Sequence, residues 1–169
     1  MKNNLKIVIG VLVGSLVLAG LIWIASPSSL TTREQVELRP GESGVINAEE
    51  NTFDFDSISM ANGDVSHKFE IKNLSENPVN IEKIYTSCMC TDAKLFLGDK
   101  SFGPYGMPGH GMIPKINQIV GPNEEAVLEV IFDPAAHGPA GVGRIIRVVY
   151  VENSGGQPLE FTIAATVTP

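Results

Sequence analysis

From residue 52 onward, apolar and polar side chains alternate in short segments separated by turn residues. A period of two places neighbouring side chains on opposite faces of an extended strand, so that one face can be buried. Seven segments show this pattern: 52–58, 65–71, 79–85, 116–120, 126–132, 144–151 and 161–167. Outside the apolar N-terminal segment, no stretch has a convincing helical period. The pattern predicts an all-β fold, an immunoglobulin-like Greek-key β-sandwich of about seven strands.

The same alternation predicts the side chains that face the core. The expected inward-facing residues are Phe69, Leu128, Val130, Phe132, Val148 and Ile163. In segment 144–151 this choice places Ile146, Val148 and Tyr150 on the buried face. A slip of one residue would exchange the two faces of that strand.

The N-terminal segment 7–25 carries no charged side chain. A helix over this segment, at ~1.5 Å per residue, is long enough to cross ~30 Å of hydrocarbon. Lys2 and Lys6 precede it, and positive charge tends to remain on the cytoplasmic side. We therefore expect residues 1–25 to form a single transmembrane helix in the cytoplasmic membrane, with the N-terminus inside and the domain in the periplasm or extracellular space.

A cleaved signal peptide is the alternative interpretation of this segment. Such peptides have shorter apolar cores, of about 7–15 residues, and small residues before the cleavage site. Cleavage after Ala25 would place the bulky Trp23 close to the site, so the uncleaved anchor is favoured. Residues 26–51 are expected to be a linker, although 44–48 are compatible with a short strand, and 52–169 form the sandwich domain.

Charge and motif content exclude several functions. The net charge is −7 and no basic stretch follows the extreme N-terminus, so nucleic acid is not an expected partner. The signatures Gly-x-Ser-x-Gly, His-Glu-x-x-His and Gly-Lys-Ser/Thr are absent, as are paired Cys-x-x-Cys motifs. The chain is therefore expected not to be an enzyme.

Sulfur and imidazole side chains gather in particular connections. If strand direction alternates, the connections 59–64, 87–115 and 133–142 share one end of the sandwich. They hold or border all the cysteines, all the histidines and every methionine after the first: Met60, His67, Cys88, Met89, Cys90, Met107, His110, Met112 and His137. The opposite end is expected to hold none.

Cys88 and Cys90 flank Met89, and three interpretations of this triplet remain open. In an extended strand such residues lie ~6.6 Å apart, whereas a disulfide needs Cβ atoms about 3.5–4.5 Å apart, so a bridge requires a turn. The pair could be structural, could be a disulfide or redox pair, or could bind a soft metal. Thiolate, thioether and imidazole together suit Cu(I). The candidate ligands are Cys88, Cys90, Met107, His110, Met112 and His137; no other cofactor is indicated.

Several motifs resemble one bacterial family. They are the segments Phe53–Ile58 and Val65–Asn73, the sequence Ser87-Cys88-Met89-Cys90-Thr91, and the later Pro122-Asn123-Glu124 and Phe132-Asp133. Their order and spacing resemble the domain of unknown function 1573 family, whose usual signatures include Phe-x-Phe-Gly, Ser-Cys-x-Cys-Thr and Pro-Gly-Glu. The resemblance covers about residues 52–167. It implies an exported immunoglobulin-like sandwich similar to ASH and major-sperm-protein domains, and no established activity.

The sequence departs from that family in three places. Asp56 stands where glycine is usual, residues 103–112 form an insert, and 135–139 form an unusual loop. The insert and the loop contain several of the candidate ligands. Two functions follow as hypotheses: a non-enzymatic binding module that contacts another envelope protein, or a soft-metal (copper) binding or delivery domain.

Overall fold

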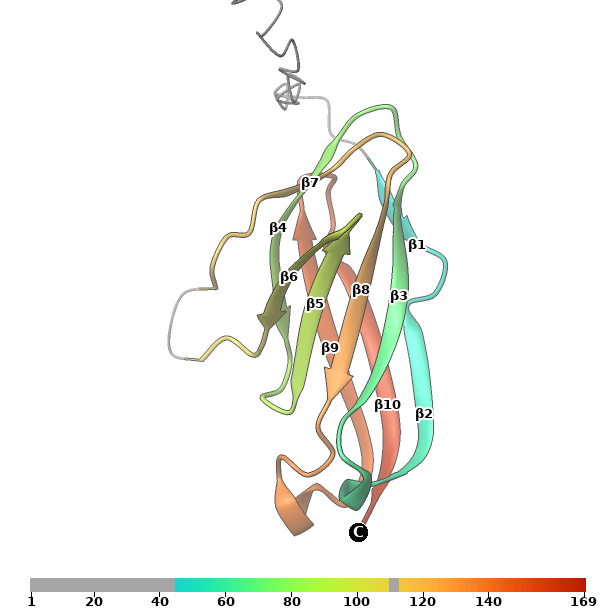
Figure 1. Ribbon diagram of the computed structural model, residues 1–169, viewed down its shortest axis with the longest axis vertical. Helices are drawn as coiled ribbons and strands as arrows, with labels where there is room; N and C mark the ends of the chain where they lie inside the picture. Colours follow the sequence, from blue (N-terminus) through green and yellow to red (C-terminus); the bar gives the residue numbers. More distant parts are fainter. Residues whose placement is uncertain (1–44, 110–112) are drawn as a thin grey trace, which may run out of the picture. The chain divides into compact units, whose positions relative to one another are not determined.

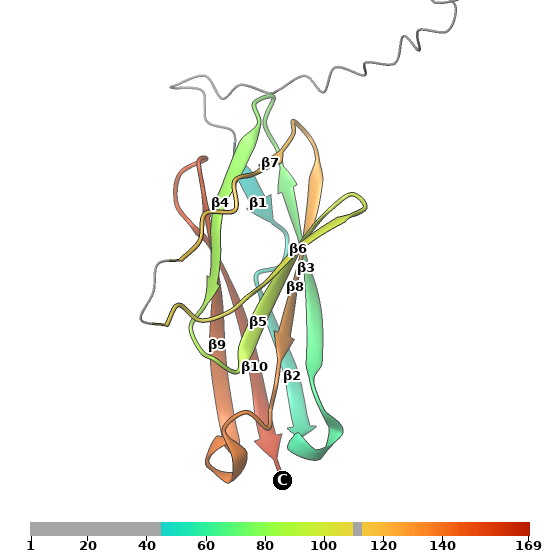
Figure 2. The same ribbon diagram turned by 60° about the vertical axis from the view of Figure 1, so that its left-hand side comes forward.

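The computed structural model describes residues 45–109 and 113–169, which form a two-layer β-sandwich (Figure 1). Its elements are β1 (Ile46–Ala48), β2 (Thr52–Ser59), η1 (Met60–Asn62), β3 (Val65–Asn73), β4 (Val79–Thr86), β5 (Thr91–Leu97), β6 (Lys100–Tyr105), β7 (Gln118–Val120), β8 (Glu125–Phe132), η2 (Gly138–Gly141), β9 (Gly143–Asn153) and β10 (Leu159–Thr168). One sheet has the order β1-β3-β8-β5-β6 and the other β2-β10-β9-β4-β7 (Figure 2). The all-β sandwich expected from the sequence is confirmed.

The predictions for the N-terminal segment concern residues largely outside this part of the chain. The expected membrane helix, 1–25, and the linker up to residue 44 lie outside the described residues. Within the described ranges, no helix is long and apolar enough to cross a membrane. Strand β1 pairs with the end of β3, with Ile46 opposite Asn73. Among the described residues, strand pairing begins at Ile46, within the stretch 44–48 that the sequence showed to be compatible with a short strand.

The structure adds a hairpin that the sequence pattern did not predict. The segment 87–115 was expected to be one irregular connection, but it contains β5 and β6, which pair with each other and extend the sheet beyond β8. Strand β5 alternates clearly, with Ala93 and Leu95 fully buried. Strand β6 contains Pro104 and is an edge strand, where the missing N–H of proline leaves no ladder position unpaired.

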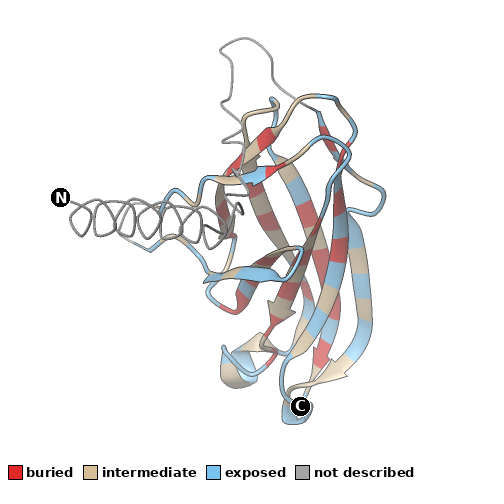
Figure 3. Cartoon of the chain, turned by 45° about the horizontal axis from the view of Figure 1, so that its top comes forward, coloured by how far each residue is buried: buried red, intermediate tan, exposed pale blue. Residues whose placement is uncertain are grey.

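The core lies between the two sheets, and its membership largely matches the expectation. Phe69, Leu128, Val130, Phe132 and Ile163 are all at most 2% exposed, which confirms five of the six expected core residues. The rings of Phe69 in β3 and Phe161 in β10 lie 5.0 Å apart and join the two sheets. Buried and exposed positions alternate along the strands (Figure 3). Burying each large side chain contributes about 1.5–3 kcal/mol.

The face assigned to β9 was wrong by one residue. Ile145, Val149 and Val151 are the buried residues of this strand, whereas Val148 is only partly buried and Ile146 is 60% exposed. The strand is apolar on both faces, so its alternation is weak. The phase with Ile146, Val148 and Tyr150 inward would leave Arg147 facing solvent, where a charged side chain is usually found. In the structure Arg147 lies on the inward side, just beyond the last pair of β4 with β9, which joins Thr86 to Val149, and its Nε reaches the Cys90 sulfur.

Three non-glycine residues of the described chain adopt backbone conformations that suit glycine, and two of them stand where the resembling family has glycine. Asp56 has φ of 58° and Asn123 has φ of 56°, both in the left-handed region. These are the positions where the resembling family has glycine in Phe-x-Phe-Gly and Pro-Gly-Glu. The register between β2 and β10 shifts at this point, after Asp54. The Asp54 carboxylate accepts a hydrogen bond from the Asp56 N–H at 2.9 Å, which helps to hold the irregular backbone. Asp and Asn tolerate this conformation better than most residues do.

Candidate functional site

A tight turn after β4 brings the two cysteines together. The Thr91 N–H donates to the Cys88 carbonyl at 3.2 Å, which closes the turn over Met89. The buried Thr86 hydroxyl lies 2.9 Å from the Cys88 carbonyl oxygen and 2.8 Å from that of Thr91, and so braces both sides of the turn. The extended geometry that would separate the two side chains is therefore absent here.

The β8–β9 connection supplies a third side chain. The Asp133 N–H donates to the Cys90 carbonyl at 2.9 Å, which fixes the start of this connection against the cysteine turn. The Asp133 carboxylate then accepts from the Ala135 N–H at 2.8 Å. His137 follows, immediately before η2, at the end of the sandwich that also carries η1 and the C-terminus (Figure 1).

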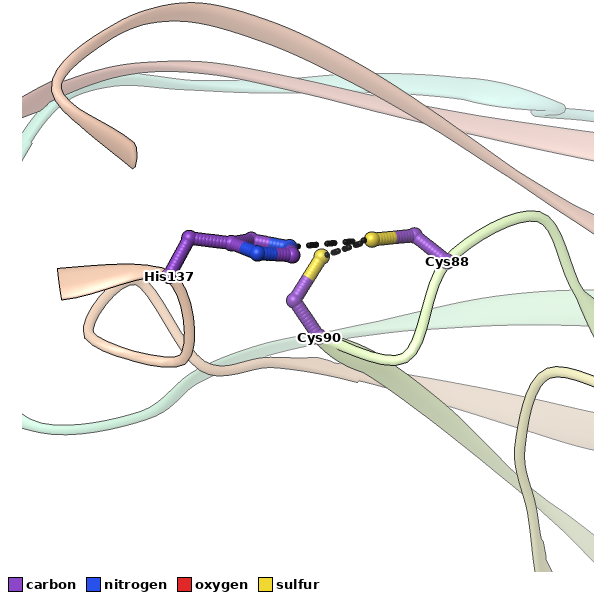
Figure 4. Close-up of side chains that lie close together, drawn as sticks. All are labelled: Cys88, Cys90 and His137. Carbon is purple, nitrogen blue, oxygen red and sulfur yellow. Dashed lines mark hydrogen bonds between the residues drawn. The ribbon is translucent and has the colours of Figure 1, made fainter. Parts of the chain in front are cut away.

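Cys88, Cys90 and His137 form a compact cluster of donor atoms, hereafter the Cys–His cluster. The two Sγ atoms are 2.6 Å apart, and the Cys88 Sγ lies 3.3 Å from the His137 Nε2 (Figure 4). All three donor atoms are within 4.8 Å of one another. Cys90 is buried, Cys88 is partly exposed and His137 is exposed, so the cluster opens to solvent on the Cys88 side.

Arg147 completes the surroundings of the cluster. Its Nε donates to the Cys90 Sγ at 3.2 Å from the inward side of β9. Reasoning from sequence missed this residue because the phase of β9 was wrong. The Ser87 N–H donates to the Val148 carbonyl oxygen, and the Val148 N–H donates to the Ser87 hydroxyl oxygen, so β9 runs beside the cysteine turn. With the correct phase of β9, Arg147 therefore places a cation next to that turn.

These contacts set different acidities for the two thiols. Partial burial alone would raise the pKa of Cys88, but the hydrogen bonds from Cys90 and His137 and the charge of Arg147 lower that pKa to about 7. Burial raises the pKa of the Cys90 thiol, and its hydrogen bond to Cys88 raises that pKa further. Cys88 is therefore the thiol that ionises first, and reactive thiolates are found in such electropositive, partly exposed places.

The sequence indicated three further ligands: Met107, His110 and Met112. Met107 lines a pocket with Ile84, Tyr105 and Pro108, and neither cysteine lines that pocket. His110 and Met112 lie outside the described residues. Among the cysteines, histidines and carboxylates of the described residues, Cys88, Cys90 and His137 form one donor group.

Met60 and His67 have structural surroundings. Met60, in η1, packs against the core. The His67 ring stacks on Phe53 at 3.6 Å, and its Nε2 lies 3.1 Å from a carboxylate oxygen of Glu50. These contacts join β3 to β2 and to the residues before it, and they account for His67 without a ligand.

The sequence and the fold resemble those of known proteins. The family model described as "Protein of unknown function (DUF1573)" matches residues 36–97. The resemblance to DUF1573 is confirmed. The matched segment contains Cys88 and Cys90, whereas His137 and Arg147 lie beyond it. No curated protein matches the sequence.

Solved structures share the fold. A protein of unknown function from Porphyromonas gingivalis W83 has a TM-score of 0.56 at 13% identity, over 79% of this chain and 51% of that one. The present chain thus spans about half the length of that protein. The ASH/PapD-like domain 7 of human CEP192 has a TM-score of 0.47 at 12% identity, over 78% and 93% of the two chains. The first likeness shows a shared fold, and neither likeness shows an activity.

Proposed function

We propose that this chain is a membrane-anchored, non-enzymatic binding module of the cell envelope, and that its sandwich holds Cu(I) between Cys88, Cys90 and His137. The observation that carries the proposal is the convergence of these three donor atoms, within 4.8 Å, from two separate connections. Thiolate sulfur is a soft ligand and imidazole is a common partner for copper, so the donor set favours Cu(I).

The charges around the cluster support a monovalent ion. Two thiolates, one neutral imidazole and Cu(I) carry a net charge of −1, and the guanidinium of Arg147 beside Cys90 balances it. The sulfur atoms, now 2.6 Å apart, separate when an ion enters between them. Partial exposure of Cys88 and exposure of His137 leave the ion accessible for transfer to another protein.

The envelope location rests on the sequence of residues 1–25. Their uncharged segment and preceding lysines favour a helix with its N-terminus in the cytoplasm, which would place the Cys–His cluster outside. The proposed partner is another envelope protein, which either receives the ion or binds the sandwich surface. Protease added to spheroplasts should digest the domain before lysis, and a domain protected until lysis would contradict this topology.

Copper retention tests the metal proposal. The reduced full chain, held in detergent, is loaded with Cu(I) and freed of unbound ion, and copper is then counted per chain. The wild type should retain about one ion, and the Cys88→Ser/Cys90→Ser variant should retain none. Met107→Leu is the matched control and should bind like the wild type, because Met107 lines a pocket without the cysteines. A folded wild type that retains no copper would contradict the proposal.

A further inference from the structure

The turn that joins the two cysteines leaves them unequal in access. Cys90 is only 3% exposed, and its sulfur accepts a hydrogen bond from Arg147. Cys88 is partly exposed and faces the exposed His137 across 3.3 Å (Figure 4). The gap of 2.6 Å between the sulfur atoms exceeds a disulfide bond of ~2.05 Å by only about 0.5 Å. An outer and an inner thiol in near-bonding contact form the arrangement that two-step disulfide exchange requires.

We infer that the metal-free Cys–His cluster exchanges with a solvent-accessible disulfide, with Cys88 as the attacking thiol and Cys90 as the resolving thiol. This activity goes beyond metal binding and does not depend on it. Exchange proceeds by attack of a thiolate on a disulfide sulfur through a mixed disulfide, so the more accessible thiol must act first.

The first step uses Cys88, the more accessible thiol. Its sulfur loses its proton to solvent and bonds to one sulfur of the substrate disulfide. The substrate S–S bond breaks, and the leaving sulfur departs with the bonding electron pair and takes up a proton. The products are one free thiol and a mixed disulfide on Cys88.

The second step uses Cys90, which already lies against the Cys88 sulfur. The Cys90 sulfur loses its proton to solvent and attacks the Cys88 sulfur, and the second substrate thiol leaves with the electron pair and a proton. The substrate disulfide is thereby reduced by two electrons to two thiols. The Cys88–Cys90 pair is oxidised by the same two electrons to a disulfide, so atoms and electrons balance.

The surface beside the attacking thiol is open and apolar. Met89, between the two cysteines, is 68% exposed and offers an apolar side chain next to the attacking residue. The substrate chemistry is an exposed disulfide, which could belong to a low-molecular-weight compound or to a polypeptide. Oxidised glutathione and insulin represent these two sources in the test.

The experiment treats the reduced full chain with oxidised glutathione in the presence of a metal chelator and follows the products by non-reducing mass spectrometry. The wild type should release two glutathione thiols per chain and end with an internal disulfide and no bound glutathione. Cys90→Ser should stop with one glutathione on Cys88. Cys88→Ser should react at least about tenfold more slowly, because its remaining thiol is buried. A parallel arm with insulin distinguishes a polypeptide disulfide from a small one.

Three results would overturn the inference. They are a wild type that keeps bound glutathione, a wild type that does not react with either disulfide, and equal rates for the two single variants when both remain folded by circular dichroism. The wild-type product mass decides the matter even if a variant fails to fold. Because the chelator removes copper, the exchange test does not depend on copper binding. A chain that retains copper but does not exchange would contradict only this inference, and a chain that exchanges but retains no copper would contradict only the metal proposal.

Discussion

The guanidinium Nε of Arg147 donates a 3.2 Å hydrogen bond to the Cys90 sulfur from a strand position on the inward side of β9. A charged side chain is tolerated on that side because Arg147 lies beside the cysteine turn, just beyond the last β4–β9 pair, and bonds a polarisable sulfur there. The same contact supplies positive charge beside both thiols and contributes to lowering the pKa of Cys88. Arg147, which breaks the alternation of β9, thus provides the cation beside the Cys–His cluster.

Arg147→Gln should raise the pKa of Cys88. The substitution removes a positive charge that favours the thiolate, while Gln keeps a polar side chain of similar length. Alkylation of Cys88 by iodoacetamide in a Cys90→Ser background, measured against pH with and without Arg147→Gln, reports the change. An unchanged pH profile would show that Arg147 does not influence the thiol.

The pH dependence of Cys88 itself follows from its lowered pKa. Its pKa is about 7 in the folded chain, against an ordinary value of 9.0, so the folded state favours the thiolate. Stabilisation from this shift is fully present above pH 9 and is lost as the pH falls through about 7. Alkylation of the folded wild type should reach half its maximal rate near pH 7, and the urea-unfolded chain should do so near pH 9. Coincident profiles would contradict the assignment.

The β9 phase can be tested with a matched pair of substitutions. Val149 is fully buried and Val148 is only partly buried on the opposite face. Val149→Ala should reduce the free energy of unfolding by roughly 2 kcal/mol, whereas Val148→Ala should cost clearly less. Urea unfolding of both variants measures the difference, and a larger loss in Val148→Ala would restore the phase expected from the alternation.

Asp56→Gly should stabilise the domain. Asp56 has φ of 58°, a conformation in which a residue with a Cβ is strained by roughly 1 kcal/mol relative to glycine. The hydrogen bond to Asp54 uses the backbone N–H and survives the substitution. A thermal midpoint that rises is the expected result, and a midpoint that falls would show that the Asp56 side chain stabilises the turn by another contact.

The sequence anticipated the meeting of the Cys-x-Cys turn with His137 because that inference needs only the alternation of strand direction. The missed β5–β6 hairpin adds two strands, which leaves this alternation unchanged, so His137 still returns to the same end. The β5–β6 hairpin was not predicted because Pro104 and several glycines follow β5, and such residues are typical of loops. The position of Arg147 beside the cysteines was not predicted because β9 is apolar on both faces, and only tertiary packing decides which face is buried.

X-ray absorption spectroscopy of the Cu(I)-loaded full chain tests the central claim most directly, because it identifies the atoms bound to the metal. We expect two sulfur ligands and one nitrogen ligand in the wild type, and loss of the nitrogen ligand in His137→Ala. The Cys88→Ser/Cys90→Ser variant should show no copper above background. Copper bound with the same ligands in His137→Ala, or retained by the variant without cysteines, would contradict the assignment of Cys88, Cys90 and His137 as the metal site.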